Sequence, residues 1–280
     1  MRKLHVRELT DSVARLCQEA NFNLPDDVIE AIKEAEDKEE STIGKQILKS
    51  LIENAKIAQD EKIPICQDTG TTIVFVKVGQ DIQFEGGSLE KAIQEGVQKG
   101  YGEGYLRKSI VDDPFMRQNT GDNNSAIIHY EIVEGDRIEL IVAPRGGGSE
   151  NMSTVHMLTP SQGREGVIRA IVQAVSKAGS NPCPPLIVGV GIGGNFETCA
   201  LLAKKALLRE VGSSHPQEHI KDLEQVILKR INELGIGPQG LGGRTTAIAV
   251  HIETAPTHIA SLPVGINIGC HVCRHKKTTL

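Results

Sequence analysis

A chain of 280 residues is long enough to bury a substantial apolar core, and 39% hydrophobic with 24% charged residues is ordinary for a globular protein. A formal net charge of −5 without any basic run argues against nucleic acid as a partner. No apolar stretch approaches the ~20 residues of a membrane-spanning helix, and the N-terminus lacks the apolar segment of a signal peptide. We therefore expect a cytoplasmic protein with no membrane partner, whose six cysteines are thiols or metal ligands rather than disulfides.

The first 60 residues are predicted to be mainly helical. Val13, Leu16 and Cys17 share one helical face, PDDVIEAIKEAEDKEES continues the pattern, and Ser41 caps a third amphipathic segment. IPICQDTG is then a short apolar run that ends in a turn, and TTIVFVKVG is a β-branched strand. Residues 88–104 are expected to form the next helix.

The rest of the chain alternates between strands and helices. LRKSIVDDPFMRQNTGDNNS is predicted to be a long polar loop, and such loops in compact domains are usually functional or disordered. Strands SAIIHYEIV and RIELIVAPR follow, joined by a turn, and then comes the loop GGGSENMST. The remaining predicted elements are a helix over 161–179, the strand PPLIVGVG, helices near 195–211 and 216–234, and the strands TTAIAVHIET and SLPVGINIG. We expect an α/β fold of mixed β-sheets flanked by helices, forming one domain over residues 1–280.

Residues 189–194, GVGIGG, match the dinucleotide-binding pattern GxGxxG between a strand and a helix. A Rossmann unit also needs a second parallel strand that ends in Asp or Glu about twenty residues further on. That region reads GSSHPQEHIKDLEQVILKRI, a turn and another helix. We therefore do not expect a Rossmann fold, and glycines that permit close packing between strand and helix are the better interpretation.

The segment INIGCHVCRH at 266–275 contains two cysteines and two histidines. A zinc site needs four ligands, and the chain has no second CxxC or HxxxH pair. Haem attachment needs His directly after the second cysteine, where Arg274 stands. A thioredoxin-like dithiol opens a helix, whereas this CxxC ends a strand. None of the three familiar CxxC sites fits this context.

Three cysteines share one kind of location, at the junction of a strand and a loop. Cys66 precedes a turn, Cys183 lies between prolines, and Cys270 ends a strand. Cys17 and Cys199 instead lie on amphipathic helices, where a buried cysteine behaves as a small hydrophobe. Three thiolates are what an iron–sulfur cluster with one unligated iron requires, and such an iron acts as a Lewis acid. Three unrelated thiols are the alternative that spacing alone leaves open.

Several motifs together resemble the class I fumarate hydratase / L-tartrate dehydratase family, whose members are oxygen-sensitive [4Fe–4S] hydro-lyases. The resemblance extends in order from about residue 5 to 275. It rests on CQDTG at 66–70, YLRKSIVDDPFMRQNTGDNNSAIIHYEIVEGD at 105–136, GGGSEN at 146–151, CPPLIVGVGIGG at 183–194 and HIETAPTHIASLPVGINIGCHVCRH at 251–275.

The resemblance implies a [4Fe–4S] cluster with one iron that has no cysteine ligand. Its ligands are expected to be Cys66, Cys183 and Cys270, and Cys273 is left out. The dicarboxylate substrate is expected to contact Gln67, Arg107 and Gly147, while Asp68 and His258 carry catalytic roles; all five positions are carried over from the family's motifs.

These residue types suit that chemistry. Arg107 has the bidentate guanidinium that binds carboxylates, and a glycine loop turns backbone N–H groups toward an anion. Asp68 is suited to proton transfer at the leaving hydroxyl, and His258 to holding a carboxylate. Without the resemblance, a surface salt bridge, a turn cap and a hydrogen-bonded core histidine explain Arg107, Asp68 and His258 as well.

Two features limit what the resemblance implies. Arg145 occupies a position where many members have Lys. The one-chain enzymes also continue into a second domain that supplies further site residues, whereas this chain stops at Leu280. We therefore expect the α subunit of a two-subunit enzyme, completed by a separate β subunit in an αβ, α2β2 or larger assembly in which α self-associates.

The expected reaction is the reversible hydration of fumarate to (S)-malate. L-tartrate dehydratase is the alternative within the family, because one additional substrate hydroxyl separates the two reactions. A non-catalytic iron–sulfur or metal-binding protein, with a fully cysteine-ligated cluster, is a further alternative.

Overall fold

The computed structural model describes residues 1–280. The chain forms two compact units: unit 1 comprises Met1–Pro25, Ala55–Gly147 and Arg274–Leu280, and unit 2 comprises Asp26–Asn54 and Gly148–Cys273. Segments of the two units alternate along the chain, so no single linker separates them. None of the helices combines the length and the apolar character that crossing a bilayer requires.

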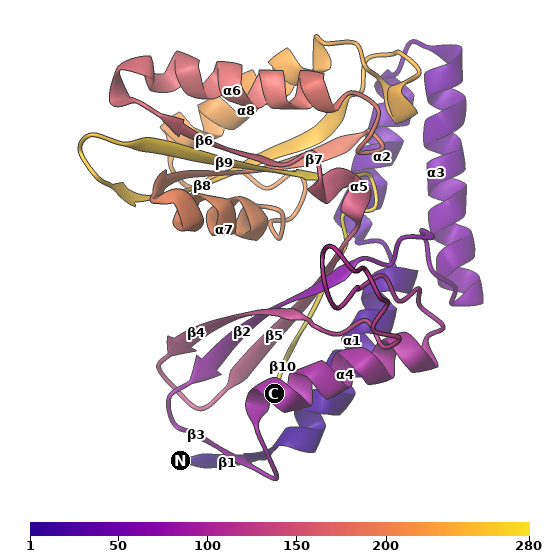
Figure 1. Ribbon diagram of the computed structural model, residues 1–280. Helices are drawn as coiled ribbons and strands as arrows, with labels where there is room; N and C mark the ends of the chain where they lie inside the picture. The colour runs from indigo at the N-terminus through magenta and orange to yellow at the C-terminus, as the bar shows by residue number, and fades with distance from the viewer. The chain divides into compact units, whose positions relative to one another are not determined.

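Unit 1 contains a four-stranded mixed sheet in the order β10-β5-β2-β4 (Figure 1). Strand β2 is parallel to β4 and antiparallel to β5, and β10 is antiparallel to β5. The strands are β2 (Thr71–Gly79), β4 (Ile127–Val133), β5 (Ile138–Arg145) and β10 (Lys276–Thr279), and a separate parallel pair joins β1 (Arg2–His5) to β3 (Ile82–Glu85).

Helices α1 (Val6–Phe22) and α4 (Leu89–Glu103) cover one face of this sheet (Figure 1). Their apolar residues and those of β2 and β5 form a single buried cluster. The two helices approach each other closely because Gly96 has no side chain: a Cβ there would lie 2.7 Å from the Cβ of Val13. The helices and β2 place the segment 62–70, which joins α3 to β2, at the edge of this core.

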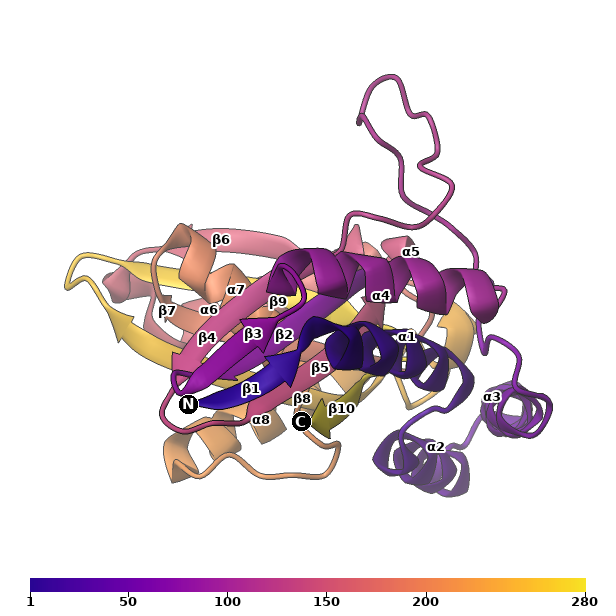
Figure 2. The ribbon, with the colours of Figure 1, turned by 90° about the horizontal axis from the view of Figure 1, so that it is seen from below.

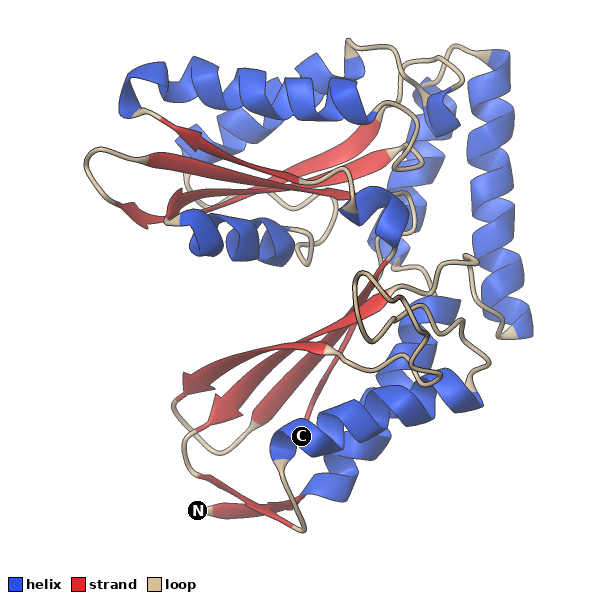
Figure 3. Ribbon diagram, in the orientation of Figure 1, coloured by secondary structure: helices blue, strands red, loops and turns tan.

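Unit 2 is built on a second four-stranded sheet in the order β6-β9-β7-β8, with β7 parallel to β8 and antiparallel to β9. Figure 3 shows α6 and α8 on one face of this sheet and α7 on the other. The strands are β6 (Thr154–Leu158), β7 (Leu186–Gly194), β8 (Ala247–Thr257) and β9 (Leu262–Gly269), and the helices are α6 (Gly163–Ala178), α7 (Phe196–Ala206) and α8 (Glu218–Asn232).

Three further helices complete the chain. Helix α2 (Asp26–Lys38) contacts β8 in unit 2. Helix α3 (Thr42–Glu61) begins in unit 2 and ends in unit 1, and the one-turn helix α5 (Gly147–Glu150) crosses the same boundary. Short 3-10 turns occupy Pro160–Gln162 and Pro238–Gly240.

The α/β fold of mixed sheets with a helical N-terminal section is confirmed. Four short strands, β1, β3, β6 and β10, were not predicted; each has four or five residues. Two of them, RKLH and KKTT, lack an apolar alternation, and a strand of four or five residues is stabilised mainly by its pairing partner. GGGSEN, expected to be a loop, begins helix α5 instead.

Candidate functional site

The segment Cys66–Gly70 has irregular backbone, yet its carbonyl groups are bound by side chains from distant parts of unit 1. Three consecutive carbonyl oxygens each accept a hydrogen bond from a side chain that is at most 2% exposed. The three pairs are Arg274 Nη2 to Asp68 O at 2.7 Å, Tyr101 Oη to Thr69 O at 2.7 Å and Asn123 Nδ2 to Gly70 O at 3.2 Å. Buried backbone outside helices and sheets requires such partners, and here they fix the loop in one conformation.

The carboxylate of Asp68 accepts two backbone hydrogen bonds. Gly70 N donates to Oδ1 at 3.0 Å and Gly147 N donates to Oδ2 at 2.7 Å. The backbone N–H of Asp68 points to the sulfur of Cys66, with N and Sγ 3.4 Å apart. The glycine loop was expected to face an anion, and the anion that Gly147 N–H binds in this structure is the carboxylate of Asp68.

Gly70 is where the loop turns into β2. Its φ is +80°, and a Cβ at this position would lie 2.6 Å from the backbone carbonyl of Arg145 on β5. Only glycine combines that backbone conformation with that close approach. The turn brings Asp68 to the end of β5, where the glycine loop begins.

Arg107 and Gln67 lie at the same loop. The hydroxyl of Thr69 donates to the backbone oxygen of Arg107 at 2.7 Å, which fixes the start of the long 106–125 segment beside CQDTG. The side chain of Arg107 is exposed. Gln67 is exposed as well, and its Oε1 lies 3.4 Å from Cys66 Sγ. Unit 1 therefore brings together Cys66, Gln67 and Asp68 with Arg107 and Gly147.

The 106–125 segment is a loop, as predicted, and Figure 2 shows it extending away from the helices of unit 1. Turns order it from within: Asp113 Oδ1 accepts from the N–H groups of Phe115 and Met116 at 2.8 and 2.7 Å. These two N–H groups hold the pKa of Asp113 below its usual value. The side chains of Phe115 and Met116 are 90% and 84% exposed.

In unit 2 the structure places Cys183 and Cys270 at the same end of the sheet. Gly269, the last residue of β9, pairs with Ile187 near the start of β7. The backbone oxygen of Cys183 accepts from the backbone N–H of His271 at 3.4 Å and from its imidazole Nδ1 at 3.0 Å. Cys183 is exposed and Cys270 half-buried.

His258 is not at that end of unit 2. It follows β8 in a turn where Thr257 pairs with Gly194, the last residue of β7. Seven or eight strand residues at about 3.3 Å each separate that end from Ile187, a span of roughly 25 Å. Within unit 2, the structure does not bring His258 together with Cys183 and Cys270.

The six cysteines divide into two groups of three by accessibility. Cys17, Cys199 and Cys273 are buried, and burial raises the pKa of the Cys17 and Cys199 thiols. The sulfur of Cys273 lies 3.8 Å from the backbone oxygen of Leu207, inside unit 2. The expected ligands Cys66, Cys183 and Cys270 are the three with accessible sulfur-bearing side chains.

These thiols fit an iron–sulfur cluster by type and environment. Cys66 accepts a backbone N–H from Asp68, and hydrogen bonds to sulfur are among the interactions that tune such clusters. Cys66 belongs to unit 1 and the other two belong to unit 2, so neither unit by itself contains all three. No group of three or more His, Cys, Asp or Glu side chains is arranged to hold a single metal ion.

The GVGIGG stretch is part of β7, and three of its four glycines, Gly189, Gly191 and Gly194, lie against helix α7. A Cβ on Gly189 would lie 2.2 Å from the oxygen of Ala203, and one on Gly191 would lie 2.1 Å from the oxygen of Cys199. The N-terminus of α7 is capped by Asn195, whose side chain accepts from Thr198 N at 2.9 Å. The packing interpretation of these glycines is confirmed.

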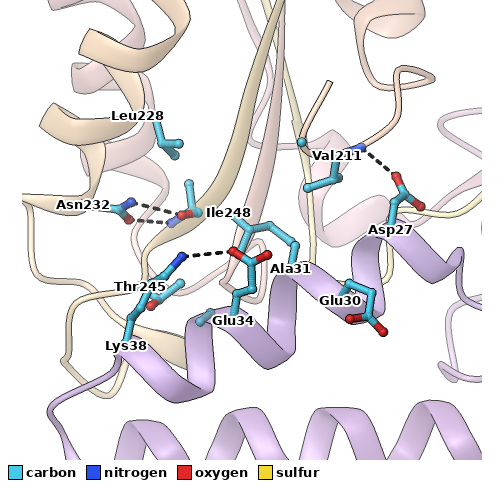
Figure 4. A pocket seen from close by; sticks show the side chains of 13 residues that line it. Asp27, Glu30, Ala31, Glu34, Lys38, Val211, Leu228, Asn232, Thr245 and Ile248 are labelled. Atoms are coloured by element: carbon cyan, nitrogen blue, oxygen red, sulfur yellow. Dashed lines mark hydrogen bonds and ion pairs between the residues drawn. The ribbon is translucent and has the colours of Figure 1, made fainter. Parts of the chain in front are cut away.

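Unit 2 also has a cavity of about 330 Å³ between α2 and β8, and none of the predicted site residues lines it (Figure 4). Its acidic side chains have partners: Asp27 accepts from Val211 N at 2.6 Å, and Glu34 binds Lys38 at 3.0 Å. Asn232 pairs with backbone groups of β8 and the residue before it. These contacts attach α2 and α8 to the sheet edge, and we assign the cavity no catalytic role.

The side chains that bind the carbonyl groups of the CQDTG loop are not predictable from the sequence. Arg274 and Asn123 nevertheless lie within the quoted motifs INIGCHVCRH and YLRKSIVDDPFMRQNTGDNNSAIIHYEIVEGD. Each of the three side chains is far in sequence from the carbonyl that it binds: the separations are 206 residues for Arg274, 32 for Tyr101 and 53 for Asn123. Only the fold brings them to one loop.

The chain thus combines an α/β fold, three cysteines that are not fully buried and an aspartate loop that is fixed by buried side chains. Comparison with known proteins shows the family to which it belongs. The sequence model described as Fumarate hydratase (Fumerase) matches residues 10–279. The chain belongs to the fumarate hydratase family, a family of hydro-lyases.

Similar proteins carry a more specific name. A Methanocaldococcus jannaschii protein is 48% identical over 269 residues, covering 94% of both chains, and is provisionally named L(+)-tartrate dehydratase subunit alpha. Escherichia coli proteins of strains UTI89 and K12 are 37% and 36% identical over 279 residues, which cover 98% of this chain and 91% of theirs. Both are named L(+)-tartrate dehydratase subunit alpha.

Proposed function

We propose that this chain is the α subunit of a two-subunit hydro-lyase that removes water from L(+)-tartrate. The observation that supports this most strongly is the name shared by relatives at 36–48% identity, which align with 94–98% of the chain. Reversible hydration of fumarate to (S)-malate is the second candidate, favoured by the description of the family. Fumarate was the first expectation from the sequence, and the names of the relatives favour tartrate instead.

In this proposal the Asp68 loop handles the leaving hydroxyl. Dehydration of tartrate removes a hydroxyl from one central carbon and a proton from the next, and gives an enol that tautomerises to a 2-oxo dicarboxylate. Asp68 is held by Gly70 and Gly147, so its carboxylate is already oriented before a substrate arrives. It transfers a proton to the departing hydroxyl when protonated.

Arg107 and Gln67 orient the substrate. The exposed guanidinium of Arg107, fixed at its backbone by Thr69, binds a substrate carboxylate with two parallel hydrogen bonds. Gln67 offers an amide to a hydroxyl or carboxylate at the same loop. The backbone N–H of Gly147 supports Asp68, so its predicted direct contact with the substrate requires Asp68 to release it.

A [4Fe–4S] cluster is part of the proposal, with Cys66, Cys183 and Cys270 as its ligands. When bound, it supplies a Lewis-acidic iron without a cysteine ligand, suited to a hydroxyl and its neighbouring carboxylate. Cys273 is buried against Leu207 and takes no part. A catalytic role for His258 stays a prediction. Within unit 2, His258 lies at the opposite end of β7 from Cys183 and Cys270.

The proposal includes a separate β subunit that supplies the base for the carbon-bound proton. The relatives' names contain the words subunit alpha, which is the support for this part. We also propose a cytoplasmic location, because free thiols and an oxygen-sensitive cluster require a reducing compartment. The assembly is αβ or a larger oligomer.

A substrate comparison tests the proposal. The α chain is expressed with its β subunit, the cluster is rebuilt anaerobically, and turnover of L(+)-tartrate, fumarate and (S)-malate is measured on one preparation. We expect kcat/KM for tartrate to exceed that for malate by at least about 100-fold, because a site that hydrogen-bonds a hydroxyl rejects the analogue lacking it. Preferential turnover of fumarate and malate would establish the second candidate.

Cysteine variants test the ligand set on the same complex. Cys66→Ser, Cys183→Ser and Cys270→Ser should each lose bound iron and activity, whereas Cys273→Ala should retain both. Iron content and the visible absorption of the cluster are measured with turnover. A complex with a full cluster and no activity on any of the three substrates would favour the non-catalytic alternative.

A further inference from the structure

Arg274 is among the largest fully buried side chains of the protein, with 2% exposure. Lys and Arg are almost never fully buried unless they are paired, because removing a charge from water is costly. The guanidinium of Arg274 donates hydrogen bonds to groups of unit 1. Its Nη2 donates to the backbone oxygen of Asp68 at 2.7 Å, and its Nε donates to Oδ1 of Asn21 at 3.2 Å.

Asn21 links Arg274 to the start of the Cys66–Gly70 loop, because it binds both Arg274 and Ile65. Its side chain is 1% exposed, and its Nδ2 donates to the backbone oxygen of Cys17 at 2.8 Å, which orients Oδ1 toward Arg274. Its backbone oxygen accepts from Ile65 N at 3.0 Å, just before Cys66. The last turn of α1 and Arg274 therefore hold both ends of the peptide that contains Cys66 and Asp68.

The polar groups of Asp68 show what this arrangement controls. Its carbonyl accepts from Arg274, its N–H faces Cys66 Sγ, and its carboxylate accepts from Gly70 and Gly147. Loss of the bond from Arg274 would free the 68–69 peptide to rotate, and the Asp68 side chain would lose one of the contacts that fix the backbone to which it is attached. Of the three side chains that bind consecutive carbonyls of the loop, Arg274 is the only charged one, and hydrogen bonds from charged donors are roughly twice as strong.

We propose that Arg274 is a positioning residue for the reaction: it sets the orientation of the Cys66–Asp68 loop, and through it the Asp68 carboxylate. The proposal rests on the proposed function, because Asp68 is taken as the group that transfers a proton. Arg274 touches neither substrate nor reacting atoms in this account. Its contribution should therefore appear in kcat, since a misplaced acid weakens the transition state more than substrate binding.

The test uses Arg274→Lys and Arg274→Met in the complete complex with its β subunit and cluster. Lys keeps the charge and reaches one acceptor, but it cannot bridge the Asp68 carbonyl and Asn21 as the planar guanidinium does. We expect kcat to fall about 10- to 100-fold in Arg274→Lys, with KM within about threefold of wild type. Arg274→Met should show a larger loss of kcat.

Hydrogen exchange provides a readout that does not depend on activity. The amides of Asp68, Gly70 and Gly147 should exchange at least about tenfold faster in Arg274→Lys, while amides of β5 and β7 keep their wild-type rates. Arg209→Lys is the matched control: Arg209 is a largely buried arginine of unit 2 that binds Glu224 at 2.5 Å. It should leave both kcat and the exchange of the loop unchanged.

Three outcomes would overturn the proposal. Wild-type kcat in a folded Arg274→Lys complex is the first, and faster exchange throughout unit 1 with kcat and KM changed together is the second. The third is failure of Arg274→Lys to fold when Arg209→Lys folds, which would leave Arg274 a structural role only. A wild-type complex inactive on tartrate, fumarate and malate would refute the proposed function, whereas the exchange experiment would still decide whether Arg274 holds the loop.

Discussion

The carboxylate of Asp68 is held both by a neighbour in the sequence and by a residue far along the chain. CQDTG alone is compatible with a simple turn in which aspartate binds the backbone N–H two residues later, and Asp68 does make that bond with Gly70. What distinguishes it is the second oxygen, which accepts from Gly147, a residue 79 positions away. A carboxylate fixed at both oxygens is suited to a directed proton transfer.

Replacing Asp68 with Asn should therefore cost more than the loss of a charge. The amide has one acceptor oxygen, so one of the two N–H groups, from Gly70 or Gly147, would face the donor Nδ2. We expect kcat of the reconstituted complex to fall at least about 100-fold in Asp68→Asn, because both the acid and its orientation are lost. Steady-state turnover at saturating substrate measures this.

Asp113→Asn is the control for Asp68→Asn. Asp113 also binds two backbone N–H groups, but both donate to the same oxygen, Oδ1, which an asparagine retains. This variant should keep wild-type kcat. A similar loss in both variants, or wild-type kcat in Asp68→Asn, would remove Asp68 from the proposed mechanism.

His251 allows a prediction about pH. Burial of the imidazole, and then the positive charge of Arg209, lower the pKa of His251 from the usual 6.5 to about 4. The unfolded chain therefore takes up the proton first as pH falls. The stability that neutral His251 contributes is complete above pH 6.5 and is lost between pH 6.5 and about 4, by on the order of 3 kcal/mol.

Denaturant unfolding at several pH values checks this. His251→Gln, which cannot be protonated, should lose less stability than wild type between pH 6.5 and 4. His219→Gln, at an exposed position of α8, should retain the full wild-type pH dependence. Equal pH dependence in wild type and His251→Gln would show that other groups cause the loss.

At the residue scale, the sequence predicted the cysteine, aspartate and arginine positions only through the family's motifs. It could not predict the residues that hold them, because Tyr101, Asn123 and Arg274 reach the loop from a helix, a long loop and the C-terminal segment. The sequence around Tyr101, Asn123 and Arg274 contains no pattern that indicates a hydrogen bond to the CQDTG loop. The accessibility of Cys183 was easier to expect, because the sequence places this residue in a proline-rich turn just before a strand.

At the scale of elements, the long amphipathic helices and the β-branched strands were predictable because their pattern extends over seven residues or more. Short edge strands were not, because their pairing partners supply the hydrogen bonds. GVGIGG shows that one sequence pattern, GxGxxG, occurs both in phosphate-binding loops and in strands that pack closely against a helix. A phosphate site needs the glycines in a loop at a helix N-terminus, whereas here they form a smooth strand surface against α7.

Gly191→Ala should therefore destabilise unit 2. The added Cβ would lie 2.1 Å from the backbone oxygen of Cys199, and the strand cannot move away without breaking its pairing with β8 and β9. We expect a loss of about 1–3 kcal/mol or more in the free energy of unfolding, measured by urea titration. Binding of a dinucleotide to the wild-type chain would contradict the packing interpretation.

Gly102→Ala is the matched control within a helix of unit 1. A Cβ on Gly102 meets no atom within 4 Å, and this residue lies in α4. Alanine is the better helix former, so this variant should be more stable by about 0.5–1 kcal/mol. Opposite signs for the two variants would separate the steric effect at β7 from the general effect of replacing glycine.

At the scale of the molecule, each unit has its own buried apolar cluster. In unit 1 it joins α1 and α4 to β2 and β5, and in unit 2 it joins α6 and α8 to the sheet. All three tyrosines of the chain, Tyr101, Tyr105 and Tyr130, belong to unit 1, and there is no tryptophan. Tyrosine fluorescence therefore reports on unit 1 alone, while far-UV circular dichroism reports on both units.

Two core variants should separate the unfolding of the units. Leu140→Ala in unit 1 and Ile227→Ala in unit 2 each remove a side chain that is 0% exposed, at a cost of about 2–5 kcal/mol. The two cores share no residue. Leu140→Ala should therefore lower the urea midpoint of the tyrosine signal. Ile227→Ala should leave that midpoint unchanged and lower the urea midpoint of the circular dichroism change that comes from unit 2. If both variants move both signals by the same amount, the chain unfolds as one cooperative unit, and the separation into two cores has no thermodynamic meaning.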